Sequence, residues 1–304
     1  MGKRFLYLLG ILLTIIIGTY FSWKLCCEEN YVDNTSTIIE ESSTQNNYQP
    51  PTLYAFTVQD ENGSTLLEAN DHFKFERSEL NFLTPVSSNL DLSIDQLKEL
   101  LLANNKFISI TGYYLENENN NSAFPNLGLA RANSVKNYFN SKGIPSKIIN
   151  TYGDKKPEMV ADSLHVFHGP IGFQIIPAKD NTEDLVVLET QIKEHPIILH
   201  FKTGQANINL TAAERQEIAD ISKYLDKVDG AVCMITGHTD NTGTPEQNIA
   251  LGLERANSIK QYLIRNAIPV EKIEVFSKGQ QEPIADNATT EGKAQNRRTV
   301  ITIK

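Results

Sequence analysis

An apolar run near the start of the chain predicts a membrane-spanning helix. Residues 5–23 form a stretch of about 19 residues without a charged side chain, which is long enough to cross a bilayer at ~1.5 Å per residue. Lys3 and Arg4 precede the run, and a positive flank should stay in the cytoplasm, placing the rest of the chain outside. We therefore expect an uncleaved membrane anchor at 1–27.

Two other interpretations of this segment stay open. A cleaved signal peptide is disfavoured by the length of the run and by the absence of an Ala-x-Ala-like site after it. Lipidation of Cys26 is the second alternative. It is disfavoured because Lys24 and Leu25 precede that cysteine, where lipoprotein signals end in a small residue.

A polar segment follows the anchor. Residues 28–51 are rich in Asn, Ser and Thr, a composition typical of a flexible linker. A coil of this kind would average roughly 25–30 Å from end to end.

The last third of the chain alternates the patterns of strands and helices. Thr211 followed by Glu214 predicts a capping box at a helix start, and apolar residues then recur at helical spacing. The sequence predicts strands at 196–201, 231–236, 272–276 and 299–303, and helices from about 211, at 246–266 and, for a short turn, at 291–296.

Part of this pattern occurs twice. Ile110-Thr111-Gly112, with the word at 127–138, echoes Ile235-Thr236-Gly237, with the word at 251–262. Self-similarity of this kind indicates repeated domains. The predicted fold class is α/β (an α+β sandwich), with two tandem domains at 52–178 and 190–304 joined through 177–184. Each is expected to be a small mixed β-sheet with helices on one face.

One acid and one base are expected to meet in the second domain. Asp240 follows a predicted strand, and Arg255 lies on the next helix, which should fold back over the sheet. A fixed carboxylate and a fixed guanidinium suit a zwitterionic ligand. The alternative is a structural salt bridge between the two, which at a surface would be worth only ~0–1 kcal/mol.

Three short motifs surround these residues within 195–304: Gly237-His238-Thr239-Asp240, Asn248-x-x-Leu251-Gly252-x-x-Arg255-Ala256 and Asn296-Arg297-Arg298. Together they resemble the OmpA-like peptidoglycan-binding family. The resemblance implies non-covalent binding of the diaminopimelate group of the peptidoglycan stem peptide. It implies a site of Asp240, Arg255, Asn248, Thr239, Arg298 and Asn207, with backbone groups near Thr203-Gly204. Gly252 departs from the usual Ser, which should loosen the helix start without removing a ligand.

The first domain is expected to lack this site. Arg131 persists there, but Leu115 falls near the position of Asp240 and Phe124 opposite Asn248. Glu116 or Glu118 could substitute, although their Asn-rich surroundings suggest a mobile loop. We interpret this copy as degenerate, acting as a spacer or a partner surface.

Charge and motifs exclude several other classes of function. The net charge of −9 argues against nucleic acid, which requires clustered Lys and Arg. Cys233 is expected to be a buried thiol and His238 a structural residue. We find no nucleophile elbow, metal-spaced His/Cys set or phosphate loop, so we predict no enzyme, no cofactor and no metal.

These expectations combine into a membrane-anchored protein of a Gram-negative-type bacterium that grips peptidoglycan from the periplasm. The anchor is expected in the inner membrane more than in the outer one, and the oligomeric state stays open. The alternative is a subunit of an envelope machine, such as a secretion system, with protein partners bound through 52–178. Stators of the MotB type carry an Asp in the span, and residues 5–23 have none, which argues against ion-driven torque.

Overall fold

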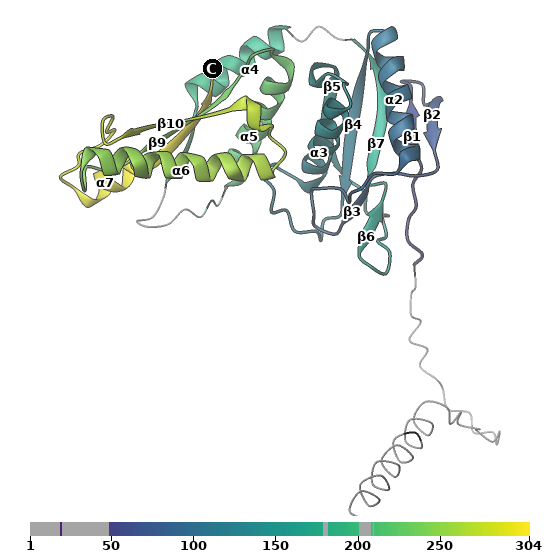
Figure 1. The fold of residues 1–304 in the computed structure, drawn as a ribbon, viewed down its shortest axis with the longest axis horizontal. Helices are drawn as coiled ribbons and strands as arrows, with labels where there is room; N and C mark the ends of the chain where they lie inside the picture. Colours follow the sequence, from purple (N-terminus) through teal and green to yellow (C-terminus); the bar gives the residue numbers. More distant parts are fainter. Residues whose placement is uncertain (1–18, 20–48, 179–181, 201–207, 209) are drawn as a thin grey trace, which may run out of the picture. The chain divides into compact units, whose positions relative to one another are not determined.

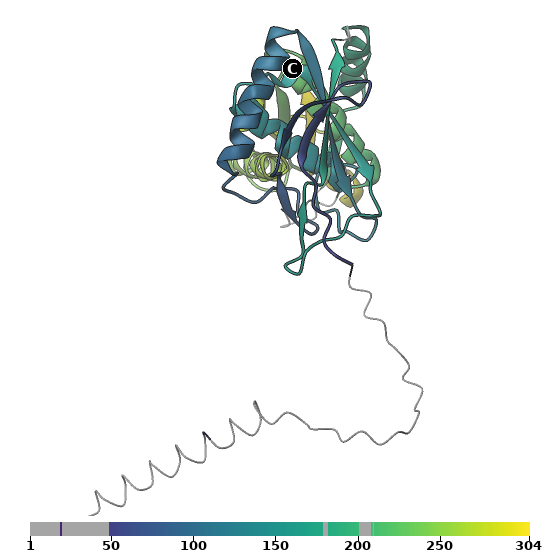
Figure 2. The same ribbon diagram turned by 90° about the vertical axis from the view of Figure 1, so that its right-hand side faces the viewer.

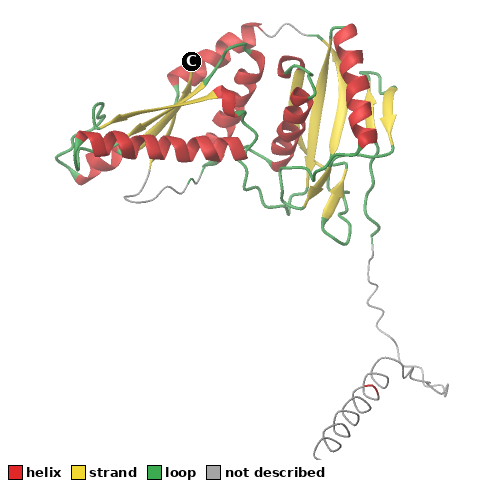
Figure 3. Cartoon of the chain, viewed as in Figure 1, coloured by secondary structure: helices red, strands yellow, loops and turns green. Residues whose placement is uncertain are grey.

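The computed structural model describes residue 19 and residues 49–178, 182–200, 208 and 210–304. The predicted span at 5–23, apart from Thr19, lies outside this part, as does most of the predicted linker. Within the described part, no helix combines the length and the apolar character needed to cross a bilayer. Residues 49–304 contain two larger β-sheets with helices packed against them (Figures 1 and 3). The predicted mixed α/β fold is confirmed.

The second sheet has the strand order β10-β9-β11-β8. Strand β9 (Cys233–His238) runs parallel to β10 (Ile273–Gly279) and antiparallel to β11 (Arg298–Ile303), and β8 (Ile197–His200) pairs antiparallel with β11. Each of these strands overlaps a segment that the sequence predicts as a strand.

Capping boxes begin both long helices of this half. At the start of α5 (Ala212–Lys227), Thr211 Oγ1 accepts from the amide of Glu214 at 3.2 Å, and the amide of Thr211 donates to Glu214 Oε2 at 2.7 Å. Helix α6 (Pro245–Arg265) begins with the same arrangement at Thr244 and Gln247. The boxes satisfy amides that have no partner within a helix, so the predicted start at Thr211 is confirmed.

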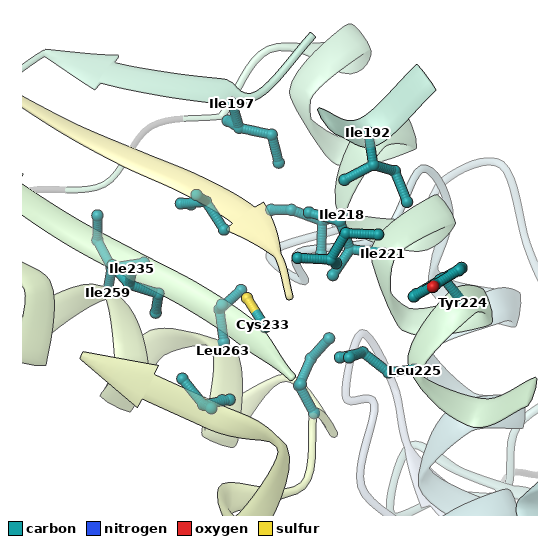
Figure 4. Packing of buried hydrophobic residues seen from close by; sticks show 14 of the residues in the cluster. Ile192, Ile197, Ile218, Ile221, Tyr224, Leu225, Cys233, Ile235, Ile259 and Leu263 are labelled. Atoms are coloured by element: carbon teal, nitrogen blue, oxygen red, sulfur yellow. The ribbon is translucent and has the colours of Figure 1, made fainter. Parts of the chain in front are cut away.

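Apolar residues of these helices pack against one face of the second sheet (Figure 4). Ile235 of β9, Ile221 of α5 and Ile259 of α6 belong to the same buried cluster. Cys233 lies in it as well, and burial raises the pKa of its thiol to about 12. The prediction of a buried thiol at this position is confirmed.

Helix α4 (Thr182–Glu194) is a helix that the sequence analysis does not predict, because it assigns a connection to 177–184. Glu183 and Asp184 lie in its first turn, where the helix dipole favours negative charge. Leu188 and Ile192, four residues apart and therefore on one side of the helix, join the core of the second sheet. The second core thus begins earlier along the chain than the pattern indicates.

The first sheet has the order β2-β1-β7-β4-β5. Helices α2 (Ser88–Ala103) and α3 (Leu127–Ser141) share its buried core, and Figure 2 shows α2 lying against one side of these strands. A separate two-stranded sheet pairs β3 (Lys74–Glu76) with β6 (Val166–His168). The strands of the first sheet are β1 (Phe56–Gln59), β2 (Thr65–Ala69), β4 (Lys106–Tyr114), β5 (Ile149–Lys155) and β7 (Ile171–Pro177).

The two sheets share a block of topology. In the first, β4 leads through α3 and the 3-10 turn η1 (Ser146–Ile148) to β5, which is parallel to it, and β7 is antiparallel to β4. In the second, β9, α6, η2 (Val270–Lys272), β10 and β11 repeat these relations. The outer neighbour differs, because β1 is parallel to β7 whereas β8 is antiparallel to β11.

A buried ion pair joins α3 to α5. Lys136 Nζ lies 2.6 Å from Asp226 Oδ2, and both side chains are almost wholly enclosed. Beside it, Asn137 Nδ2 donates to the carbonyl oxygen of Ala267 at 2.8 Å. Separating the two sheets would break this pair and return both charges to water, so the net free energy that it contributes is smaller than the attraction between the two charges. The ion pair and the hydrogen bond join α3 to the second half of the chain at a fixed position.

His72 is held neutral in the first core, which makes folding sensitive to acid. Its Nδ1 accepts from the amide of Phe73 at 2.8 Å, and its Nε2 lies 3.0 Å from the carbonyl oxygen of Ile171. Burial, the largest effect, lowers the pKa of His72 from 6.5 to about 4. Between these values the unfolded chain binds a proton that the folded protein does not, so stability is present above pH 6.5 and is lost as pH falls toward 4.

We expect the free energy of unfolding to decrease with acidity across this window, measured by urea denaturation at several pH values. In His72→Phe, stability at pH 7 falls because Ile171 loses a partner, but the slope with pH becomes shallower. The control is His195→Gln, at an exposed position, which should show the same dependence of unfolding free energy on pH as the parent. An unchanged slope in His72→Phe would contradict this assignment.

Candidate functional site

A close approach between helix and strand sets the site. A Cβ on Gly237 would lie 1.9 Å from the carbonyl oxygen of Gly252, and a Cβ on Gly252 would lie 2.3 Å from Ser277 Oγ, so only glycine fits at either position. Gly252 lies in the interior of α6. It permits close packing there, which corrects the expectation that it loosens the helix start.

Arg255 follows Gly252 by one turn and therefore lies on the same side of α6. Its Nη1 donates to the carbonyl oxygen of His238, at the end of β9, at 3.3 Å, and only 5% of the residue is exposed. Desolvation is the main cause that lowers the pKa of Arg255, followed by the positive charge of Arg297, while Asp240 opposes them. The three charged groups thus act on one another at the end of this strand.

Asp240 lies just after β9 and is 8% exposed. Its Oδ1 accepts from the amide of Thr242 at 2.9 Å, and its Oδ2 accepts from Arg297 Nη1 at 2.8 Å. Burial by itself would raise the pKa of Asp240, but the hydrogen bonds from Arg297 and Thr242 outweigh it and hold the pKa below its ordinary value. The carboxylate is therefore ionised and fixed in orientation.

The arginine beside Asp240 is Arg297, whereas the sequence analysis selects Arg298 as the supporting residue. Arg298 begins β11 and donates through Nη2 to the carbonyl oxygen of Glu282 at 3.1 Å. Helix α7 (Thr290–Asn296) ends one residue before Arg297, so that side chain leaves the helix end instead of following the alternation of the strand. Alternation indicates that the two arginines diverge, but it does not say which one meets Asp240.

Two neutral residues of the expected site lie nearby. Asn248, on the first turn of α6, donates through Nδ2 to Gln280 Oε1 at 2.6 Å. The amide of Thr239 donates to the carbonyl oxygen of Gly279 at 2.9 Å, and its buried Oγ1 has no hydrogen-bond partner within the described residues. Asn207 and Thr203-Gly204, also expected at the site, lie outside the described residues.

Asn296 organises the loop that faces Asp240, a role that the sequence analysis misses. Its Oδ1 accepts from the amides of Ile284 and Ala285 at 2.7 and 3.0 Å, and its Nδ2 donates to Asn287 Oδ1 at 2.9 Å. Asn287 Oδ1 also accepts from the amide of Asn241 at 3.3 Å. The fully buried Asn296 therefore links this loop to the residue after Asp240. Its place before Arg297 is the only signal for it in the sequence.

His238 lies behind the site and is not suited to acid–base chemistry near neutral pH. The residue is buried, and desolvation, with a further contribution from the charge of Arg298, lowers the pKa of His238 to about 4. Across the described residues, no cluster of three or more His, Cys, Asp or Glu side chains could hold a metal ion. The site therefore offers fixed charges and hydrogen-bonding groups, which suit binding of a small charged group.

The first sheet repeats the glycine contact and places an arginine in the same way. A Cβ on Gly112 would lie 1.9 Å from the carbonyl oxygen of Gly128, and Arg131, one turn on, donates to the carbonyl oxygen of Tyr113 at 2.9 Å. This carbonyl follows Gly112 as that of His238 follows Gly237. The two arginines thus have equivalent anchors.

Glu118 closes the arginine site of the first sheet. Its Oε1 lies 2.6 Å from Arg131 Nη2 and its Oε2 lies 3.2 Å from Nη1, with both side chains wholly buried. The same carboxylate accepts from the amides of Ser78 and Leu115 at 2.9 and 2.8 Å. The Asn-rich segment is expected to be a mobile loop, but here it supplies a buried partner to the arginine. Glu118 thus occupies the fork of the Arg131 guanidinium.

Removing Glu118 should therefore destabilise the protein strongly. We expect Glu118→Ala to cost about 3–5 kcal/mol of unfolding free energy, because it leaves the Arg131 charge buried without its partner. The control is Glu116→Ala, which removes an exposed ion pair with Lys155 and should leave the denaturation midpoint unchanged. Equal stability of the two variants would show that the pair carries no structural role.

Comparisons with known proteins identify the second half. Residues 200–297 match the model of the OmpA family. Outer membrane protein Omp38 of Acinetobacter baumannii is 41% identical over 105 residues, which are 34% of this chain and 29% of that protein. Peptidoglycan-binding protein ArfA of Mycobacterium tuberculosis is 34% identical over 100 residues, 33% of this chain and 31% of that protein. The chain thus spans about a third of the length of these relatives.

Among solved structures, the peptidoglycan-associated lipoprotein from Burkholderia pseudomallei is 26% identical, with a TM-score of 0.30, and the match covers 35% of this chain and 89% of that one. The family match lies on the half of the chain that contains β9, α6, α7 and the Asp240 site. Residues 200–297 therefore form a C-terminal OmpA family domain.

Proposed function

We propose that the C-terminal domain binds peptidoglycan non-covalently, by gripping the diaminopimelate group of the stem peptide. The observation that carries this proposal is that Asp240 and Arg255 both lie at the end of β9, largely enclosed, and that the charge of Asp240 acts on Arg255. A ligand with one carboxylate and one ammonium would complement such a pair. The name of the similar mycobacterial protein, a peptidoglycan-binding protein, supports the same ligand class.

Each side chain would have a separate role. Arg255 would bind the ligand carboxylate through paired N–H groups, and Asp240 would bind the ammonium. Arg297 keeps Asp240 ionised and oriented, so it acts as a positioning residue. Neutral hydrogen bonds would come from Asn248 and Thr239. Arg298 and Asn207 stay in the proposed site as predictions from the family resemblance.

The rest of the chain would connect this domain to a membrane. The uncharged segment at 5–23 would anchor the protein, preferably in the inner membrane, with the folded part in the periplasm. Residues 52–178 would be a second, degenerate OmpA-like domain. The shared topology and the Gly112–Gly128 contact support a common origin, and Glu118 in place of a ligand supports a loss of binding.

Co-sedimentation of the full-length protein with peptidoglycan sacculi tests the proposal. The parent should pellet, whereas Asp240→Ala and Arg255→Ala should each bind at least ~30-fold more weakly, since truncating one member of a buried charge pair costs about 2 kcal/mol or more. Arg265→Ala, at an exposed position of the same helix, is the matched control and should bind like the parent. A folded parent that stays in solution would refute wall binding.

Competition with small molecules tests the chemistry of recognition. Free meso-diaminopimelate should release the parent from sacculi. Pimelate, which has the same carbon chain and carboxylates but no ammonium groups, should be at least ~10-fold less effective, because Asp240 would lose its partner. In Asp240→Ala this difference should shrink. If both molecules released the parent equally well, Asp240 would have no role in recognising the ammonium group.

A further inference from the structure

The face of the first sheet opposite α2 and α3 carries a row of neutral polar side chains. In register, Gln59 of β1 pairs with Gln174 of β7, Gln174 with Ser109 of β4, and Ser109 with Asn150 of β5. Residues in register on neighbouring strands point to the same side. Their chain neighbours Val58, Phe173, Ile108 and Ile149 are buried in the core under the helices, so this row lies on the uncovered side.

A second row continues the same chemistry. Thr111 of β4 pairs with Gly172 of β7 and with Tyr152 of β5, a residue that is 52% exposed. A hollow of ≈ 460 Å³ lies over this part of the sheet, and no carboxylate lines it. Its polar lining residues are Tyr54, Thr57, Gln59, Thr111, Tyr113, Lys156 and Gln174.

Lys156 marks one end of this hollow. Its Nζ lies 4.1 Å from the centroid of the Tyr54 ring and 4.4 Å from that of Tyr113. Within the described part of the chain Lys156 forms no ion pair, so two aromatic faces stabilise its charge in place of a carboxylate. Gly172 leaves room for Tyr113, because a Cβ there would lie 2.7 Å from the tyrosine oxygen.

The polar groups of this face are available to a ligand. The side chains of Ser109, Thr111 and Asn150 form no hydrogen bond with other described residues, and Gln174 makes one long contact of 3.4 Å with the carbonyl oxygen of Asp60. The corresponding row of the second sheet differs, since Met234 stands at the position of Ser109 and pairs in register with Glu274 of β10 and Thr302 of β11. The neutral polar row is therefore not a general property of this fold.

We propose that this face of the first sheet binds a glycan strand of N-acetylated amino sugars. Amide and hydroxyl side chains both donate and accept, as hydroxyl and acetamido groups require. A single lysine is too little positive charge for a polyphosphate backbone, and the row lacks the apolar core of a protein interface. Three strand spacings of ~4.8 Å give a platform of ~14 Å, which accommodates a short oligosaccharide.

This inference rests on the proposed function, because a protein held at peptidoglycan meets glycan strands and stem peptides in the same polymer. The first domain would then contact the sugar chain while the second grips the peptide. In the first domain, Glu118 pairs with Arg131 and would prevent binding of the stem peptide there. That domain would instead bind the glycan part of the same polymer.

Titration calorimetry with peptide-free glycan strands, prepared from sacculi with an amidase, tests the proposal. The full-length protein would carry Asp240→Ala and Arg255→Ala, so that stem-peptide binding cannot contribute. This protein should bind the strands. Adding Gln59→Ala with Gln174→Ala should weaken binding about tenfold, since two hydrogen-bonding side chains are lost, and Lys156→Met should also weaken it.

The matched control is Gln96→Ala. Gln96 is an exposed glutamine on α2, the helix that packs on the other side of the sheet, so this variant should bind like its parent. Thermal melts followed by circular dichroism confirm that each variant is folded. A folded parent that does not bind the strands overturns the proposal, as does binding that Gln59→Ala with Gln174→Ala leaves unchanged. Failure of sacculus binding by the wild-type protein would instead refute the function on which the inference rests.

Discussion

The contact on which the site depends is the approach of a helix to a central strand through paired glycines. Gly237 of β9 with Gly252 of α6, and Gly112 of β4 with Gly128 of α3, leave no room for a side chain between helix and strand. An arginine one turn further along the helix then meets the carbonyl oxygen that follows the strand glycine. The packing of helix against strand thus places the guanidinium group of an arginine at the end of the strand, independently of the other residues of the site.

The two equivalent arginines, Arg131 and Arg255, have different surroundings. Arg131 is enclosed by Glu118, by backbone carbonyls and by the rings of Phe75 and Phe167, whose centroids lie 5.4 and 5.5 Å away. Arg255 instead shares its surroundings with Asp240 and Arg297, which form an ion pair with each other, and the charge of Glu254 also acts on it.

Much of the fold and part of the site follow from local sequence signals. Alternation and helical spacing locate the strands and long helices, and the capping box at Thr211 gives a helix start. The position of Asp240 after a strand and of Arg255 on the next helix is enough to bring them together. The predictions of strands, helices and the helix start succeed because each depends on residues close along the chain. The place of Asp240 and Arg255 at one strand end depends only on the return of a helix over its sheet.

The remaining features depend on contacts between distant segments. Helix α4 is stabilised by the second core, which its own weak apolar pattern does not reveal. Glu118 gains its partner from α3 and its amide donors from loops, so composition alone suggests mobility. Arg297 meets Asp240 because a short helix ends just before it. The spacing of apolar residues along the sequence predicts none of these three contacts.

In the proposed role of connecting a membrane to the wall, the ion pair between Lys136 and Asp226 would have a mechanical consequence. Its attraction acts over a short distance, and water entering a widened gap would quickly weaken it. Under tension, residues 49–304 would therefore hold a constant length until the joint between the sheets fails, and would then lengthen in a single step.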